Sequence, residues 1–217
     1  MNEQISLKTS DGVTIIGDYY EGGGEKAVLL LHMMPATRAS WIAFANKLVA
    51  EGWSALAIDL RGHGESISGP SGTLDYKNFS DGEHQASIVD VESGIEYLVQ
   101  RGMKEISIAG ASIGANLALV YAAEHPNIHS VILLSPGLDY RGVNTEAVAP
   151  KISEPTRVYL IASKEDDYSA ASVKDLYENL PIKNKKIEVL DGAGHGTTIL
   201  ERKHEYLEIL ANWLSGK

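Results

Sequence analysis

The segment Gly110-Ala111-Ser112-Ile113-Gly114 decides the fold, because it joins an apolar stretch at 105–109 to an alanine- and leucine-rich run at 116–123. It is a Gly-x-Ser-x-Gly pattern in a strand–turn–helix context. A serine at so sharp a turn has a strained backbone, which exposes its hydroxyl at the positive end of the following helix. A side chain at either glycine would collide with neighbouring backbone in so tight a turn. The pattern therefore predicts that Ser112 is a nucleophile.

Outward from this turn, strand-like apolar runs alternate with segments of helical period. A turn at Ser10-Asp11-Gly12 predicts a hairpin between the first two strands. The strands are expected at 3–9, 13–20, 27–31, 53–60, 105–109, 130–135, 157–162 and 185–190. The helices are expected at 38–51, 81–101, 113–125, 169–180 and 198–214.

This alternation predicts an α/β protein with right-handed βαβ units. We expect one domain over 1–217, with a mostly parallel central sheet of about eight strands and helices on both faces. The strand at 27–31 is apolar without alternation, as a sheet covered on both faces requires. Chemistry in such sheets collects at the carboxyl ends of the strands.

Composition restricts the possible functions. The chain has 217 residues, 44% hydrophobic and 22% charged, as in globular proteins. It has no cysteine, which excludes disulfides, cysteine-ligated metals and a thiol nucleophile. The net charge of −10 argues against nucleic-acid and anionic-membrane partners. The N-terminus lacks signal character and no apolar run could span a bilayer, so a cytoplasmic location is expected.

A serine nucleophile needs a general base, and His195 is the best placed of seven histidines. It lies in a glycine-rich loop after the strand at 185–190 and before the last helix. His84 and His204 are expected on polar helix faces and His125 at a helix end. His129 is expected at the wrong end of a strand.

The third member should be a buried carboxylate that orients the imidazole. The strand at 157–162 is followed by Glu165, Asp166 and Asp167. Asp166 is the first choice and Asp167 the second, although either could instead favour the start of the next helix through its dipole. Glu165 could simply be solvated. Asp139, after the strand at 130–135, is a lesser competitor.

An oxyanion hole needs backbone N–H donors. Ile113, at the start of a helix, offers one. The second should come from the loop after the strand at 27–31, where Pro35 has no N–H, so Met34 or Met33 must supply it.

The chain resembles α/β-hydrolase-fold serine hydrolases, in particular small bacterial and archaeal carboxylesterases, over nearly all of its length. The matching residues are His32, the segment Asp59-Leu60-Arg61-Gly62-His63-Gly64-Glu65-Ser66, the pattern at 110–114, Asp166 and His195. The order Ser, Asp, His is that of this family and differs from the chymotrypsin and subtilisin orders. The family usually has His-Gly in the oxyanion loop, whereas Met33 replaces the glycine here, and by analogy Met34 is the donor. Arg61 and His63 match a segment that shapes a loop and has no catalytic role.

Members of this family often carry a helical cap after the strand that corresponds to 130–135. Here only residues 136–155 intervene, which allows a short flap, with at most one helix at 145–149, in place of a cap domain. The predicted pocket is shallow, with Met33, Leu138 and Tyr140 around it, beside Met34 and Ile113.

The sequence therefore predicts a cofactor-independent serine carboxylesterase with no metal, whose partner is a small-molecule ester substrate. The same triad would also serve a thioesterase, an amidase or peptidase, or a perhydrolase. A non-catalytic hydrolase-fold binding module is an alternative of another class. The oligomeric state is left open, with a homodimer as one option.

Overall fold

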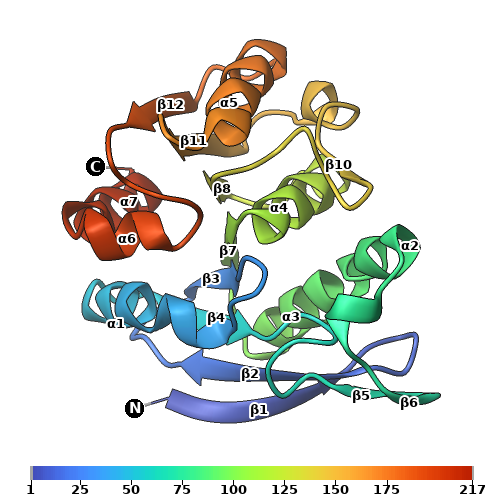
Figure 1. Cartoon of the computed structure of the whole chain (residues 1–217). Helices are drawn as coiled ribbons and strands as arrows, with labels where there is room; N and C mark the ends of the chain where they lie inside the picture. Colours follow the sequence, from blue (N-terminus) through green and yellow to red (C-terminus); the bar gives the residue numbers. More distant parts are fainter. Residues whose placement is uncertain (1, 217) are drawn as a thin grey trace.

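A twisted sheet runs through the molecule and helices cover both of its faces (Figure 1). The computed structural model describes residues 2–216. The strands are β1 (Asn2–Lys8), β2 (Thr14–Tyr20), β3 (Lys26–Leu31), β4 (Ser54–Ile58), β5 (Ser68–Gly69), β6 (Gly72–Thr73), β7 (Glu105–Ala111), β8 (Ser130–Leu134), β9 (Asp139–Tyr140), β10 (Val143–Asn144), β11 (Arg157–Ser163) and β12 (Lys185–Leu190). The α-helices are α1 (Ile42–Ala50), α2 (Asp81–Gln85), α3 (Ile88–Gln100), α4 (Ile113–Glu124), α5 (Asp167–Asn179), α6 (Thr198–Arg202) and α7 (Glu205–Ser215). Short 3-10 helices are η1 (Arg38–Trp41), η2 (Tyr76–Asn78) and η3 (Ala149–Lys151).

The sheet order is β12-β11-β8-β7-β3-β4-β2-β5-β6, with β1 also paired to β2. The strands from β12 to β4 in this order are parallel, whereas β2 is antiparallel to both β1 and β4. The expected hairpin joins β1 to β2. The predicted α/β class and mostly parallel sheet are confirmed, and the two-residue strands β5 and β6 extend the sheet beyond the expected strands.

Two apolar cores form on opposite faces of this sheet. On β3, Leu29 and Leu31 face one core, and Val28 and Leu30 face the other; all four side chains are fully buried. Helices α3, α4 and α5 cover the first core, and α1, α6 and α7 cover the second (Figure 1). Burial on both faces explains why this strand shows no apolar–polar alternation.

Some helices differ from their expected extents. The single helix expected at 81–101 is divided into α2 and α3, and the one expected at 198–214 into α6 and α7. The helix expected at 38–51 begins as η1. At each of these points backbone bonds run to the third residue back, as from Ser87 N–H to the His84 carbonyl at 3.1 Å and from Tyr206 N–H to the Lys203 carbonyl at 2.9 Å. These tighter turns redirect the chain without disturbing the apolar faces.

The loop after β4 is organised around the buried carboxylate of Asp59. That carboxylate accepts the backbone N–H of Arg38 at 2.7 Å and of Glu65 at 2.9 Å, and it pairs with the Arg38 guanidinium. Gly64 has a φ of 51°, and a Cβ there would lie 2.1 Å from an Asp59 oxygen. Only glycine therefore allows the chain to pass so close to this carboxylate.

Arg61 ties this loop to α3 and to the first hairpin. Its backbone N–H and its Nε each donate to the Asp90 carboxylate at 2.9 Å, and its guanidinium pairs with Asp11 at 2.6 Å. Burial raises the pKa of Asp90 to about 6, and the facing Arg61 opposes that rise. His63 stacks on Tyr76 with ring centroids 3.8 Å apart. The ion pairs of Arg61 and the stacking of His63 on Tyr76 are contacts that hold the shape of a loop.

We expect Asp90→Ala to lower the free energy of unfolding by about 3–5 kcal/mol, because it leaves the Arg61 charge buried without its main partner. Asp11→Ala removes the partner whose side chain is 40% exposed, and it should cost less than about 1 kcal/mol. Denaturant unfolding of the two variants beside the parent measures both values. Equal losses for the two variants would contradict this division of roles.

Candidate active site

Ser112 lies in the turn between β7 and α4 with a φ of 53° and a ψ of −121°. A Cβ on Gly110 would lie 2.2 Å from the Gly114 carbonyl oxygen, and a Cβ on Gly114 would lie 2.5 Å from the Leu31 carbonyl oxygen. Both glycines are therefore required by close backbone approach, as the sequence predicts. The strained serine is held at the end of the sheet where β3 and β7 both terminate.

Asp166 and His195 are in direct contact. The His195 Nδ1 donates to the Asp166 carboxylate at 2.6 Å. Asp166 is also the N-cap of α5, where its other oxygen faces the Ser169 N–H at 3.5 Å. The Asp166 carboxylate therefore contacts both the His195 imidazole and the start of α5.

The two competing aspartates lie elsewhere. Asp167 is the exposed first residue of α5. Asp139 accepts the Gly142 N–H at 2.7 Å and so serves the flap. Among the three candidates, the hydrogen bond to His195 belongs to Asp166.

Several contacts bring the His195 loop to the serine turn. A Cβ on Gly196 would lie 3.4 Å from the Ala111 Cβ, so this loop packs against the residue preceding Ser112. The Gly196 N–H donates to the Ser135 hydroxyl at 2.9 Å. Tyr140 approaches from the flap, with its ring 6.4 Å from the His195 ring. Burial raises the pKa of the Tyr140 phenol, and hydrogen bonds with the Ser169 and Ser112 side chains oppose that rise.

Glu165 is not the merely solvated residue that the sequence allowed. Its carboxylate accepts the backbone N–H groups of Gly194 at 2.9 Å and Gly192 at 3.1 Å, which fixes the loop that carries His195. Hydrogen bonding to the Ser163 side chain, and then to the Gly194 N–H, lowers the pKa of Glu165 to about 2. No local pattern in the sequence pointed to this role, since the small residues around His195 indicated only a loop.

His32 fixes the loop that should supply the second oxyanion donor. Its Nε2 accepts the Leu60 N–H at 3.0 Å, so its Nδ1 carries the proton and donates to the Met33 carbonyl at 2.9 Å. Burial lowers the pKa of His32 to about 4, which keeps the ring in this neutral form near pH 7. The ring therefore ties the start of the oxyanion loop to the end of β4.

The two expected oxyanion donors lie at this end of the sheet: Ile113 begins α4, and Met34 is in the loop that follows β3. Ile113 is the first residue of α4, so its N–H lacks an intrahelical partner. Within residues 2–216, the Met34 N–H also forms no backbone hydrogen bond. Both groups are thus available to an incoming oxygen.

The flap at 136–155 is a small hairpin followed by a 3-10 turn. Strands β9 and β10 pair across Arg141 and Gly142, and η3 replaces the helix expected at 145–149. Pro150 lies in the first turn of η3. No regular α-helix forms in this segment, so the site is covered by little more than a two-stranded ribbon.

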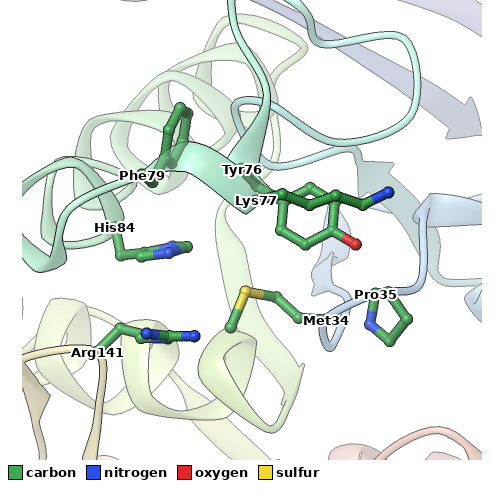
Figure 2. A pocket seen from close by; sticks show the side chains of 7 residues that line it. All are labelled: Met34, Pro35, Tyr76, Lys77, Phe79, His84 and Arg141. Carbon is green, nitrogen blue, oxygen red and sulfur yellow. The ribbon is translucent and has the colours of Figure 1, made fainter.

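A pocket of about 360 Å³ opens beside the oxyanion loop. Its apolar wall consists of Met34, Pro35, Tyr76 and Phe79. Its polar wall consists of Lys77, His84 and Arg141. In Figure 2, His84 and Arg141 lie close together on one side of Met34, and Lys77 lies beside Tyr76.

The residues expected around the substrate pocket, Met33, Leu138 and Tyr140, lie outside this lining, and their role at the substrate stays a prediction. Met33 packs against Gly196, Leu138 packs against the first apolar core, and Tyr140 lies beside His195. His84 is buried against Phe79 and does not lie on a polar helix face. The helix that carries His84 is only the five-residue α2, which ends at Gln85, and its His84 side chain faces inward.

Comparison with known proteins identifies the class. A family model for the alpha/beta hydrolase fold matches residues 26–157, and the chain therefore belongs to the alpha/beta hydrolase family. The match includes the whole segment from β3 to the start of β11, and with it the Ser112 turn.

Individual relatives are distant. The chain is 27% identical over 121 residues to a thermostable monoacylglycerol lipase of Bacillus sp. (strain H-257), which covers 56% of this chain but only 44% of that lipase. The Pyrococcus furiosus esterase Pf2001 superposes with a TM-score of 0.80 at 22% identity, covering 99% of this chain and 92% of that one. An esterase from Exiguobacterium antarcticum gives a TM-score of 0.76 at 16% identity, covering 98% and 100%. These two structures show a shared fold.

No group of three or more His, Asp or Glu side chains within residues 2–216 is arranged to hold a metal ion. Among the helices described, none is both long and apolar enough to cross a membrane.

We expect Asp166→Asn to lower kcat by on the order of 10⁴-fold, because asparagine removes the charge and favours the wrong imidazole tautomer. Asp167→Asn should leave kcat unchanged and cost only roughly 0.3–1 kcal/mol of helix stabilisation. Steady-state ester hydrolysis with circular dichroism on both variants tests this. The reverse ranking would move the acid by one residue, and two small effects would remove it from this loop.

Proposed function

We propose that this chain is a serine carboxylesterase that hydrolyses short-chain acyl esters through an acyl-enzyme intermediate. The observation that carries the proposal is the 2.6 Å hydrogen bond from His195 to Asp166, beside the strained Ser112 turn. A bound pair of this kind leaves the imidazole Nε2 free to accept a proton.

In the first half-reaction, the Ser112 Oγ attacks the ester carbonyl carbon while His195 Nε2 takes its proton. The carbonyl oxygen becomes negatively charged, and the N–H groups of Ile113 and Met34 donate to it. The C–O bond to the alcohol then breaks, and the protonated His195 gives its proton to the leaving oxygen. The acyl group is now bound to Ser112 as an ester.

In the second half-reaction, water attacks the acyl carbon and gives its proton to His195. The same two N–H groups stabilise the second oxyanion, and His195 returns the proton to Ser112 as the carboxylic acid leaves. Asp166 keeps the imidazole in one orientation and stabilises the imidazolium in both steps. Glu165 acts indirectly, by holding the loop on which His195 lies.

The names of the similar proteins support ester chemistry, since they are a monoacylglycerol lipase and esterases. Thioester, amide and peracid chemistry would use the same triad. A non-catalytic binding module would need neither a strained serine nor an Asp–His hydrogen bond beside it, so we place it second.

Ser112→Ala should abolish labelling by a fluorophosphonate and lower p-nitrophenyl acetate hydrolysis by on the order of 10⁴-fold or more. The matched control is Ser107→Ala on the same strand, since the Ser107 hydroxyl is buried without a hydrogen-bond partner in the described chain. The control should retain labelling and activity. A folded Ser112→Ala protein with parental activity would rule out the proposed nucleophile.

The flap predicts a preference for short acyl chains. Each buried CH₂ contributes roughly 0.8 kcal/mol, so a deep apolar channel would make kcat/KM rise steadily with chain length. With only a two-stranded ribbon above the site, kcat/KM should rise over the first few carbons, from acetate to butyrate or slightly beyond, and then level off. Rates on p-nitrophenyl esters of increasing length measure this. A rise that continues to dodecanoyl esters, or a jump at the solubility limit, would show that the flap works as a lid.

A further inference from the structure

The pocket beside the oxyanion loop carries positive charge in a chain whose net charge is −10. Its lining includes Lys77 and Arg141 and no acidic residue. Within residues 2–216, neither cationic side chain forms an ion pair or a side-chain hydrogen bond. Both residues are exposed, so their charged groups are open to a ligand that enters the pocket.

Three of the nearby acids are already engaged with the protein, whereas Asp81, in the first turn of α2, acts on His84 through its charge. Asp75 accepts the Lys77 backbone N–H at 3.1 Å, and Glu83 accepts the Ser80 N–H at 2.8 Å in a capping box. Asp139 accepts the Gly142 N–H at 2.7 Å. These carboxylates stabilise turns, and the two cations remain available to a ligand.

Arg141 lies in a tight turn that packs on α2. It is the first residue of the two-residue turn between β9 and β10, where its φ is 55° and that of Gly142 is 77°. A turn with positive φ at both positions favours Asn-Gly or Gly-Gly, so an arginine is retained there against its conformational preference. A Cβ on Gly142 would lie 2.2 Å from the Gln85 side chain, so the turn is seated on α2. Arg141 is thereby fixed beside His84, as Figure 2 shows.

The pocket is connected to the reacting groups on two sides. Met34, the proposed oxyanion donor, forms part of its wall. Tyr140, the neighbour of Arg141, has its ring centroid 6.4 Å from that of His195. The pocket that Arg141 lines thus borders the oxyanion loop, and the residue next to Arg141 borders His195.

We propose that this pocket binds a carboxylate or phosphate group of the substrate, so that the preferred esters carry a small anionic group a few bonds from the scissile carbonyl. This inference rests on the proposed esterase function and specifies its substrate class. Arg141 binds the anion directly, Lys77 adds to the local positive potential, and His84 is a neutral hydrogen-bonding wall. Burial, and then the charge of Arg141, lower the pKa of His84.

The test compares matched charged and neutral esters. Monomethyl glutarate is compared with methyl pentanoate for a charge on the acyl side, and 3-acetoxypropionate with butyl acetate for a carboxylate on the alcohol side. For phosphate, 2-acetoxyethyl phosphate is compared with 2-acetoxyethanol. The parent should favour the charged member of at least one pair, and added NaCl should weaken that preference.

Arg141→Gln should lower kcat/KM for the preferred charged ester about tenfold, and leave the neutral partner within about twofold, because a charge-assisted hydrogen bond is lost. Arg141→Lys should keep most of the preference, since it preserves the charge, and Lys77→Gln should weaken it less than Arg141→Gln does. Lys183→Gln is the matched control. It removes one positive charge from an exposed site just before β12, at the opposite end of the strands, and should leave the ratio unchanged.

Binding gives a readout that does not depend on turnover. In Ser112→Ala protein, monomethyl glutarate or inorganic phosphate should shift the NMR signals of His84 and Tyr76, and the further change Arg141→Gln should abolish the shifts. This inference would be overturned if the parent preferred the neutral ester in all three pairs. It would also be overturned if a preference for the charged ester survived both Arg141→Gln and Lys77→Gln. In either case, Ser112-dependent hydrolysis of neutral esters would leave the esterase proposal standing. If no ester is hydrolysed but the anion shifts appear and depend on Arg141, the pocket stands and the esterase proposal fails.

Discussion

The close approach of backbone at the start of α4 is the constraint on which the rest of the site depends. Gly114 lets the first turn of this helix touch the carbonyl groups at the end of β3, and Gly110 lets the helix fold back on β7. The intervening Ser112 is left with a φ of 53°, a conformation that costs a non-glycine residue of order 1–3 kcal/mol. Burial of α4 against the first core offsets that cost, so the geometry of the Ser112 turn is maintained by packing.

The loops around this turn are held by polar side chains that accept backbone N–H groups. His32 accepts from Leu60, Asp59 accepts from Arg38 and Glu65, and Glu165 accepts from Gly192 and Gly194. Each acceptor follows a strand and reaches the loop of a different strand, and Asp59 also holds its own loop through Glu65. Loops without secondary structure of their own would otherwise leave their backbone donors unpaired, at a cost of about 1–3 kcal/mol for each buried group. The same bonds therefore stabilise the fold and fix the positions of the oxyanion and histidine loops.

The features that could be predicted from the sequence are those that depend on residues close together along the chain. The strand–turn–helix around Ser112, the first hairpin and the apolar strands all have local signals, and the structure contains each of them. The sequence did not predict His84 in a pocket wall or Glu165 on the histidine loop, because both depend on contacts made after the chain has folded. The choice between Asp166 and Asp167 also lay beyond it. That choice turns on where α5 begins, a boundary that local preferences define only to within a residue or two.

The positions of strained backbone residues indicate where the site lies, independently of its side-chain chemistry. Among the described residues, the non-glycine residues with positive φ are Ser112, Ser135 and Arg141. Ser112 is the proposed nucleophile, and Ser135 accepts the Gly196 N–H beside His195. Arg141 lines the pocket beside the oxyanion loop. Strained residues persist only where the surrounding structure over-determines them, and they concentrate at functional sites. The strain at Arg141 thus lies in the same small region as the strain at Ser112, on a flap whose other contacts lead to Ser112 and His195. The same turn holds Arg141 in the lining of the pocket that we propose binds the anionic group of the substrate.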